Sequence, residues 1–140
     1  MMRPFSITDP LPTGTTVLEA SAGTGKTYAI AALAARFVAE GRASIGDLLL
    51  VTFSRAATAE LRSRVRERLQ SSAAALRAHV ADGAECVDDV DRVLAMGEAD
   101  EVARRALRLA DAVDRFDQAT IMTTHEFCHG MIRGLGVLAP

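Results

Sequence analysis

The amino-acid sequence predicts an α/β fold in which helices flank a parallel sheet. Three observations support this prediction: a short apolar run at residues 16–18 leads into a glycine-rich turn, a helical pattern follows, and a continuous apolar run occupies residues 48–53. A run without polar alternation is typical of a parallel strand covered on both faces. We expect a right-handed βαβ crossover, with the glycine-rich turn at the carboxyl end of the first strand. A third strand is predicted at residues 119–123.

Helical periodicity accounts for much of the remaining chain. Residues 26–40 carry apolar side chains at three- and four-residue spacing, and Gly41 follows where a helix usually ends. A second helix is expected to begin near Ser54, because apolar residues four positions apart follow it. Residues 71–116 are rich in alanine, arginine and aspartate and are predicted to form a helical insertion. Helical spacing returns at residues 124–132.

Composition narrows the class of protein. The chain has 140 residues, of which 49% are hydrophobic and 24% charged, and this is ordinary for one folded domain. A net charge of -2 gives no overall attraction for a polyanion. The apolar runs are too short to span a bilayer, the two cysteines lie far apart, and the start lacks a secretory leader pattern. A cytoplasmic protein without membrane contact is therefore expected.

The glycine-rich turn has the composition of a phosphate-binding loop. Glycines let successive backbone N–H groups point inward, and the following helix adds the positive end of its dipole. The lysine would reach the outer phosphates of ATP and the threonine after it would bind Mg²⁺. The common pattern begins with glycine, where this chain has Ala20. The predicted ATP-binding residues are Ala20, Ser21, Ala22, Gly23, Thr24, Gly25, Lys26 and Thr27, with Lys26 and Thr27 also catalytic and Thr27 the Mg²⁺ ligand.

Three segments resemble the first helicase motifs of the UvrD-like superfamily 1 DNA helicases. They are LEASAGTGKT, LLLVTFSRAATAELRSRVRERL and TTHEFCHGMI, and they occur in the family's order. Within the superfamily the chain resembles the RecB-type helicase-nucleases, in which alanine at the first loop position is usual. The resemblance implies that residues 1–140 are the N-terminal part of a P-loop NTPase (RecA-like) domain, which is incomplete here, with residues 71–116 inserted in it.

The same resemblance implies a function for the full-length protein. It would unwind DNA in the 3′ to 5′ direction by hydrolysing ATP and would carry an exonuclease, acting in double-strand break repair by homologous recombination. Its implied partners are a DNA single strand at a duplex end and RecC-like and RecD-like subunits.

DNA contacts are also implied by the resemblance, at the ends of two predicted strands. Phe53 could stack its ring on bases, although a core phenylalanine is the alternative interpretation. Glu126 stands where the family usually has a small residue, and with Thr123 it also fits a capping box. The implied DNA-binding residues are Thr52, Phe53, Arg55, Thr124 and His125.

The other arginines that follow Arg55 have a simpler interpretation. Glu60 and Arg64 stand four residues apart in the order that stabilises a solvated helix face. Only Arg55 is therefore assigned to DNA.

Two alternative functions remain open at this point. One is another P-loop NTPase or a kinase. The other is a zinc peptidase, because residues His125 to His129 match the H-E-x-x-H pattern, in which Glu126 would be the general base. A third zinc ligand is hard to find, since none of the 11 residues after His129 is His, Glu, Asp or Cys and His79 is the only other histidine.

ATP hydrolysis requires a further strand whose carboxylate holds Mg²⁺ and activates water. Asp88, Asp89 and Asp91 follow no apolar strand and are assigned to a helical surface. The chain is therefore expected to be the N-terminal part of a longer protein, inactive in hydrolysis by itself.

Overall fold

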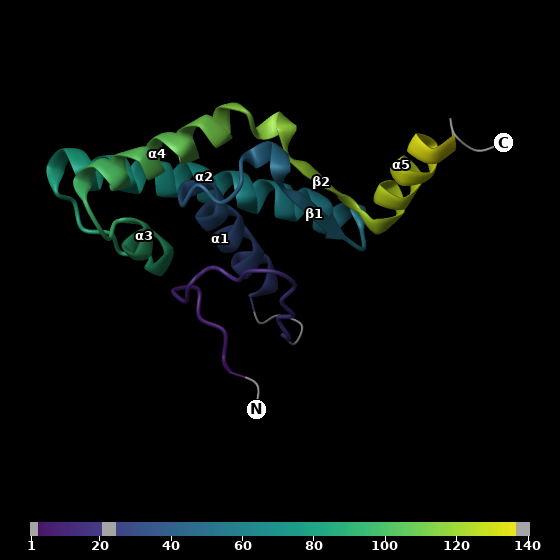
Figure 1. Ribbon diagram of the computed structural model, residues 1–140, viewed down its shortest axis with the longest axis horizontal. Helices are drawn as coiled ribbons and strands as arrows, with labels where there is room; N and C mark the ends of the chain where they lie inside the picture. Colours follow the sequence, from purple (N-terminus) through teal and green to yellow (C-terminus); the bar gives the residue numbers. More distant parts are fainter. Residues whose placement is uncertain (1–2, 21–24, 137–140) are drawn as a thin grey trace.

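Five α-helices, two short strands and two 3-10 turns form the parts of the chain that the computed structural model describes, residues 3–20 and 25–136 (Figure 1). The helices are α1 (Lys26–Ala39), α2 (Arg55–Asp82), α3 (Asp89–Leu94), α4 (Ala99–Asp114) and α5 (Thr124–Gly136). The strands are β1 (Leu49–Thr52) and β2 (Thr120–Thr123), and the 3-10 turns are η1 (Ile45–Asp47) and η2 (Phe116–Gln118).

The two strands form a parallel sheet, as predicted for the second and third apolar segments. Leu49 pairs with Thr120, and the register continues to Thr52 opposite Thr123. The α2, α3 and α4 helices connect the strands, so this crossover is entirely helical. One face of the sheet packs against α2 and buries Ile121. On β1, by contrast, Leu49 and Val51 are 46% and 42% exposed, so the prediction that this run is covered on both faces is wrong.

The prediction of a strand at residues 16–18 is also wrong, because residues 15–20 form no regular structure. Val17 is 79% exposed and Leu18 44% exposed, so this apolar run packs into no core. A strand needs a neighbour whose backbone groups complete its hydrogen bonds, and such a short run cannot supply them by itself. The expected βαβ unit around the glycine-rich turn is therefore not formed.

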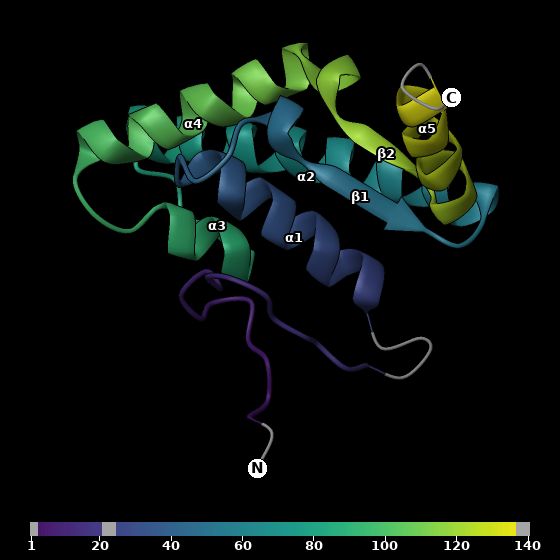
Figure 2. The same ribbon diagram turned by 45° about the vertical axis from the view of Figure 1, so that its right-hand side comes forward.

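The core lies among the helices, with α4 alongside α2 and α1 packed against both (Figures 1 and 2). Almost all buried side chains of α1 are small, mainly alanines, so its backbone comes close to its neighbours. The α2 helix buries Leu61, Val65 and Leu69 at four-residue spacing, as the sequence predicted. It continues without a break to Asp82, beyond residue 71. No helix in the described ranges is long and apolar enough to cross a membrane.

Local backbone and side-chain geometry explains where α2 begins and where α1 ends. The Ser54 Oγ accepts a hydrogen bond of 3.1 Å from the backbone N–H of Ala57 and so caps α2. Gly41, with φ of 73°, follows the last turn of α1 in the left-handed conformation that favours glycine after a helix.

The lead-in segment, residues 3–12, is fastened to α1 by one arginine. Arg36 is 3% exposed, and its Nη1 donates to the carbonyl oxygens of Ile7, at 2.8 Å, and Asp9. Its Nε donates to a Glu40 carboxylate oxygen at 2.8 Å. The lead-in therefore lies against the C-terminal half of α1.

Candidate functional site

The start of α1 has the backbone geometry that an anion site needs. Gly25 precedes the helix in a left-handed conformation, with φ of 84°, and the Ala29 N–H closes the first helical bond on its carbonyl at 2.9 Å. Glycine has no side chain to cap the first-turn amides, and that turn contains no acidic residue. Lys26 and Thr27 are its first two residues, with Lys26 exposed and Thr27 half-buried. First-turn amides that Gly25 does not cap, the helix dipole and a lysine charge therefore meet at one point.

The remaining predicted ATP-binding residues lie before this helix. Ala20 is exposed and outside any helix or strand. Ser21, Ala22, Gly23 and Thr24 lie outside the described residues, so their part of the prediction remains a prediction.

A cleft of about 530 Å³ adjoins Gly25 and Lys26. The lead-in contributes Phe5 to its walls, residues 15–20 contribute Leu18, and α1 contributes Ile30. A volume of this order is typical of small-molecule sites, which combine apolar walls with a few polar groups. Among the described residues, the lining is Phe5, Leu18, Glu19, Ala20, Gly25, Lys26, Ala29, Ile30 and Leu33.

Lys26 has a further distinction in the sequence. It is the only lysine, and every other basic residue among the 16 Lys and Arg is an arginine. Arginines make all the ion pairs found in the described residues. The single compact ammonium group therefore stands at the start of α1, where a phosphate chain would need it.

The residues implied to contact DNA come together at the carboxyl end of the sheet. Thr52 ends β1 and Phe53 follows it, while Arg55 begins α2. Thr124 begins α5, and its Oγ1 donates a hydrogen bond of 3.2 Å to the Thr52 carbonyl oxygen. In Figure 2 the first turn of α1 and the ends of both strands point toward the same side of the molecule.

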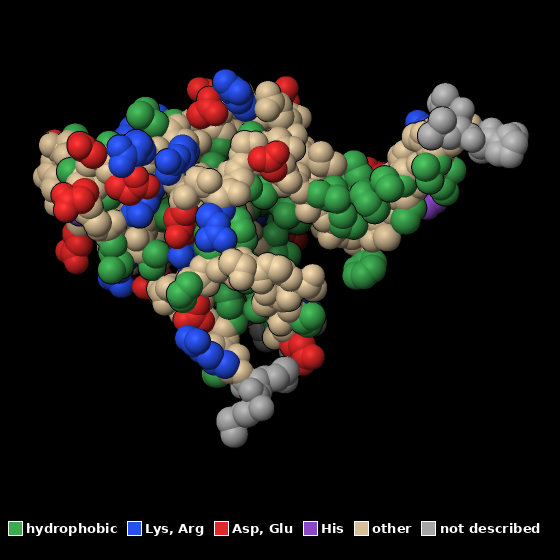
Figure 3. Space-filling model, in the orientation of Figure 1, with side chains coloured by type: hydrophobic (Ala, Val, Ile, Leu, Met, Phe, Trp, Pro, Cys, Tyr) green, Lys and Arg blue, Asp and Glu red, His purple; other side chains and the backbone are tan. Residues whose placement is uncertain are grey.

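Phe53 is 97% exposed, so the alternative interpretation as a core phenylalanine is wrong. The Thr52 hydroxyl, unlike the Phe53 ring, points toward the start of α2. Its Oγ1 contacts the hydroxyl of Thr58 and donates to the Ser54 carbonyl at 3.1 Å. Figure 3 shows hydrophobic side chains gathered over the strands and α5. This end of the sheet thus presents an exposed ring on a largely apolar surface.

Three other arginines of α2 contact groups of the chain itself. Arg62 donates to the Ile121 carbonyl at 2.9 Å, and the Arg66 guanidinium lies 5.7 Å from the centre of the Phe116 ring. Arg64 lies 3.9 Å from Glu67, so the expected ion pair with Glu60 is not formed.

The histidines of the H-E-x-x-H pattern share one exposed side of α5. The His125 and His129 rings stack, with centroids 5.5 Å apart and planes inclined by 21°. The Glu126 N–H donates to Thr123 Oγ1 at 3.1 Å, so Thr123 caps the helix and makes one of the two hydrogen bonds of the predicted capping box. Across residues 3–20 and 25–136, no group of three His, Cys, Asp or Glu side chains is placed to hold a metal. The zinc-peptidase alternative therefore lacks a third ligand there.

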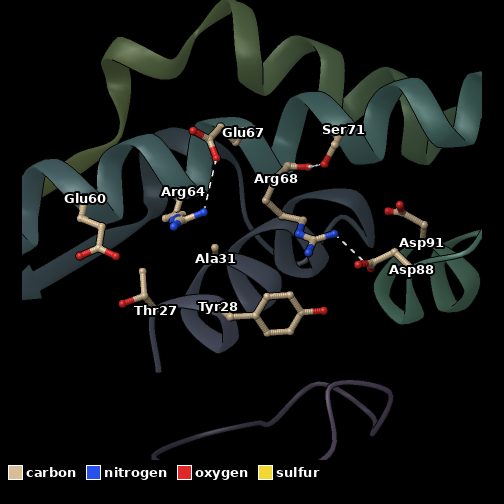
Figure 4. A pocket seen from close by; sticks show the side chains of 10 residues that line it. All are labelled: Thr27, Tyr28, Ala31, Glu60, Arg64, Glu67, Arg68, Ser71, Asp88 and Asp91. Atoms are coloured by element: carbon tan, nitrogen blue, oxygen red, sulfur yellow. Dashed lines mark hydrogen bonds and ion pairs between the residues drawn. The ribbon is translucent and has the colours of Figure 1, made fainter. Parts of the chain in front are cut away.

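A second hollow, of about 680 Å³, lies between α1, α2 and α3 (Figure 4). Sequence reasoning missed it, because Asp91 had been assigned to a helical surface. Asp91 is only 6% exposed. The available signal was its spacing, since it lies three residues before the buried Leu94 and next to the buried Val90. Ten residues line this hollow, hereafter the α1–α3 groove: Thr27, Tyr28, Ala31, Glu60, Arg64, Glu67, Arg68, Ser71, Asp88 and Asp91.

Comparison with known proteins agrees with the resemblance found in the sequence. The RecBCD enzyme subunit RecB of Mycolicibacterium smegmatis is 49% identical over 138 residues, which cover 97% of this chain and 12% of that protein. The RecB subunits of Mycobacterium tuberculosis strain H37Rv and Escherichia coli K12 are 46% and 38% identical, over 97% and 85% of this chain. The chain spans 12% and 10% of their lengths. A family model described as the UvrD/REP helicase N-terminal domain matches residues 6–139. The chain therefore belongs to the UvrD/REP helicase family.

Proposed function

We propose that this chain is the N-terminal ATP-binding segment of a RecB-like, ATP-dependent DNA helicase. The observation that carries the proposal is the start of α1, where Gly25 leads directly into Lys26 and Thr27. First-turn amides and the helix dipole favour an anion there, and Lys26 adds a full positive charge. In this role Lys26 contacts the outer phosphates of ATP and Thr27 binds Mg²⁺. The bound Mg²⁺ would neutralise charge on the phosphates during hydrolysis.

The apolar cleft beside Lys26 supports the nucleotide assignment. It adjoins the proposed phosphate site and is large enough for a small organic group. Arg36 helps to form the cleft by holding the lead-in, which carries Phe5, against α1. We infer that the nucleotide lies partly in this cleft.

The carboxyl end of the sheet is the proposed contact surface for single-stranded DNA. Phe53 offers an exposed ring, and stacking of bases on aromatic rings tolerates any sequence. Arg55 at the start of α2, together with Thr124 and His125 at the start of α5, places polar groups beside it. The Thr52 hydroxyl is engaged by α2, so we assign Thr52 to this surface through its backbone.

The activity of the whole protein is proposed from the resemblance. The matched relatives are named as RecB subunits of a RecBCD enzyme, and the chain covers 12% of the one from Mycolicibacterium smegmatis. We infer that the longer protein unwinds DNA in the 3′ to 5′ direction, carries an exonuclease and assembles with RecC-like and RecD-like subunits. Its role would be double-strand break repair by homologous recombination in the cytoplasm, and residues 71–116 would be an insertion within its first ATP-binding domain.

The test is ATP hydrolysis by the longer protein with and without single-stranded DNA. We expect DNA to stimulate hydrolysis and Lys26→Ala to reduce the stimulated rate at least about 100-fold, since Lys26 acts directly on the reacting phosphates. Arg42→Ala, an exposed basic residue beyond the opposite end of α1, is the matched control. Unchanged turnover in Lys26→Ala would overturn the proposal. DNA-independent phosphate transfer to a small acceptor would support a kinase-like P-loop protein instead.

A further inference from the structure

The α1–α3 groove is lined by more negative than positive charge. Four of its side chains are carboxylates, Glu60, Glu67, Asp88 and Asp91, whereas two are guanidinium groups, Arg64 and Arg68 (Figure 4). The groove runs along α2 from Glu60, near Thr27, to Ser71, near Asp91. At the helical rise of about 1.5 Å per residue, these two ends are about 16 Å apart.

Both guanidinium groups are already paired. Arg68 lies 3.0 Å from Asp88, and its guanidinium also lies 5.2 Å from the centre of the Tyr28 ring. Arg64 lies 3.9 Å from Glu67. Among the ion pairs of the described residues none includes Glu60 or Asp91, so the groove has a carboxylate without an ion-pair partner at each end.

Of these two carboxylates, Glu60 and Asp91, only that of Asp91 is buried. Its side chain is buried at 6% exposure, and its buried Oδ1 makes no well-aligned hydrogen bond within the described residues. Ser72, behind it on α2, is also buried, and its Oγ has no hydrogen-bond partner. Burial raises the pKa of Asp91, although the neighbouring Ser72 hydroxyl opposes this shift. A buried acceptor without a full set of donors destabilises a protein, and Asp91 lines the groove, so a donor that enters the groove would complete the hydrogen bonding of its carboxylate.

We propose that the α1–α3 groove binds a basic segment of a partner protein, in which one arginine or lysine donates to Asp91 and a second pairs with Glu60. An extended chain advances about 3.3 Å per residue, so a segment of about five residues spans most of the groove and long basic side chains bridge the rest. The guanidinium group of arginine is the better match to a buried carboxylate, because it donates two parallel hydrogen bonds.

Two other occupants fit less well. A metal ion would need at least three suitable ligands, and no such group occurs within residues 3–20 and 25–136. An anion such as a nucleotide phosphate would meet the unpaired charges of Glu60 and Asp91, while both arginines are held by other carboxylates. The inference goes beyond the proposed motor function and does not depend on ATP binding at Lys26.

The test uses the longer protein and a fluorescently labelled peptide, Arg-Gly-Gly-Gly-Arg, with binding followed by fluorescence anisotropy. We expect saturable binding that weakens at least about 10-fold in Asp91→Asn and in Glu60→Gln, since each variant loses one charge-assisted contact. Asp89→Asn is the matched control, because Asp89 lies in the same helix but does not line the groove. Circular dichroism of each variant verifies that the fold is retained.

A second peptide, Arg-Arg-Gly-Gly-Gly, has the same charge with its arginines adjacent. We expect it to bind at least about 10-fold more weakly, because it reaches only one end of the groove. Equal binding of the two peptides would overturn the proposal. The same conclusion would follow if Asp91→Asn, correctly folded, bound the first peptide as tightly as the unsubstituted chain, or if ATP rather than either peptide occupied the groove.

Discussion

Thr124 Oγ1 donates a hydrogen bond of 3.2 Å to the carbonyl oxygen of Thr52, and so joins the carboxyl ends of the two parallel strands. Phe53 follows Thr52 directly and begins the turn into α2, while His125 follows Thr124 in α5. The bond therefore fixes the spacing between the two segments to which we assign DNA contacts. It also explains why those residues, about 70 positions apart in sequence, form one surface.

The exposed ring of Phe53 gives the first prediction. In the longer protein, Phe53→Ala should weaken binding of single-stranded DNA by about 1 to 3 kcal/mol, because a base loses its stacking platform. Affinity is measured with a labelled oligonucleotide by anisotropy. Leu107→Ala on α4 is the control, since Leu107 is also exposed, at 67%, and lies on a helix outside this surface. Equal losses in the two variants would count against a DNA role for Phe53.

The buried carboxyl of Asp91 predicts a pH dependence of stability. Burial is the largest cause that raises its pKa above the ordinary value, and nearby Asp88 acts in the same direction. The folded chain therefore holds the Asp91 proton at pH values where the unfolded chain has lost it. Stability contributed by this proton is complete below the unfolded pKa and is lost as pH rises through the folded pKa.

Asp91→Asn removes this titration, so its stability relative to the unsubstituted chain should increase as the pH rises above about 4, the ordinary pKa of an aspartate. Urea unfolding at several pH values measures the difference, and subtraction cancels the carboxyls that both proteins share. The exposed neighbour Asp89, as Asp89→Asn, should show a much smaller trend. A difference that stays flat with pH in Asp91→Asn would show that Asp91 keeps its ordinary pKa.

Arg36 predicts how firmly the lead-in is attached. Arg36→Met keeps much of the apolar stem but removes the donors to Ile7, Asp9 and Glu40, which should lower the free energy of unfolding by about 2 to 3 kcal/mol. Chemical denaturation measures this loss, and protease cleavage within residues 3–12 should become faster. Arg42→Met, at an exposed site, should change neither quantity. Similar stability for both variants would contradict the role given to Arg36.

Local signals allowed most of the helices to be predicted from the sequence. Apolar spacing and the Ser54 cap identify α2 from residues close together in the chain, and Gly41 marks the end of α1 in the same way. The strand expected at residues 16–18 depends instead on a neighbouring strand, which a local pattern cannot reveal. The wrong prediction that β1 is covered on both faces has the same cause, because an apolar run does not show which elements will cover it.

The candidate site was predictable where chemistry and sequence spacing coincide. Lys26 and Thr27 stand at the start of α1 as the loop pattern predicted, while the role of the site remains a prediction. The α1–α3 groove was not predictable, because its charges come from α2 and from the start of α3, which lie apart in the sequence. Arg64 turns to Glu67 rather than to Glu60, and only tertiary packing buries Asp91.

The most direct test of the central claim is protection of Lys26 from an amine-selective reagent in the longer protein, with and without MgATP. Peptide mapping identifies the position, because Lys26 is the only lysine in these 140 residues. We predict that saturating MgATP slows modification of Lys26 at least about 10-fold, since few protein molecules then have an empty nucleotide site. AMP, which lacks the outer phosphates, should not slow it. Equal rates of modification with and without MgATP would contradict the assignment of the start of α1 as the site that holds the triphosphate.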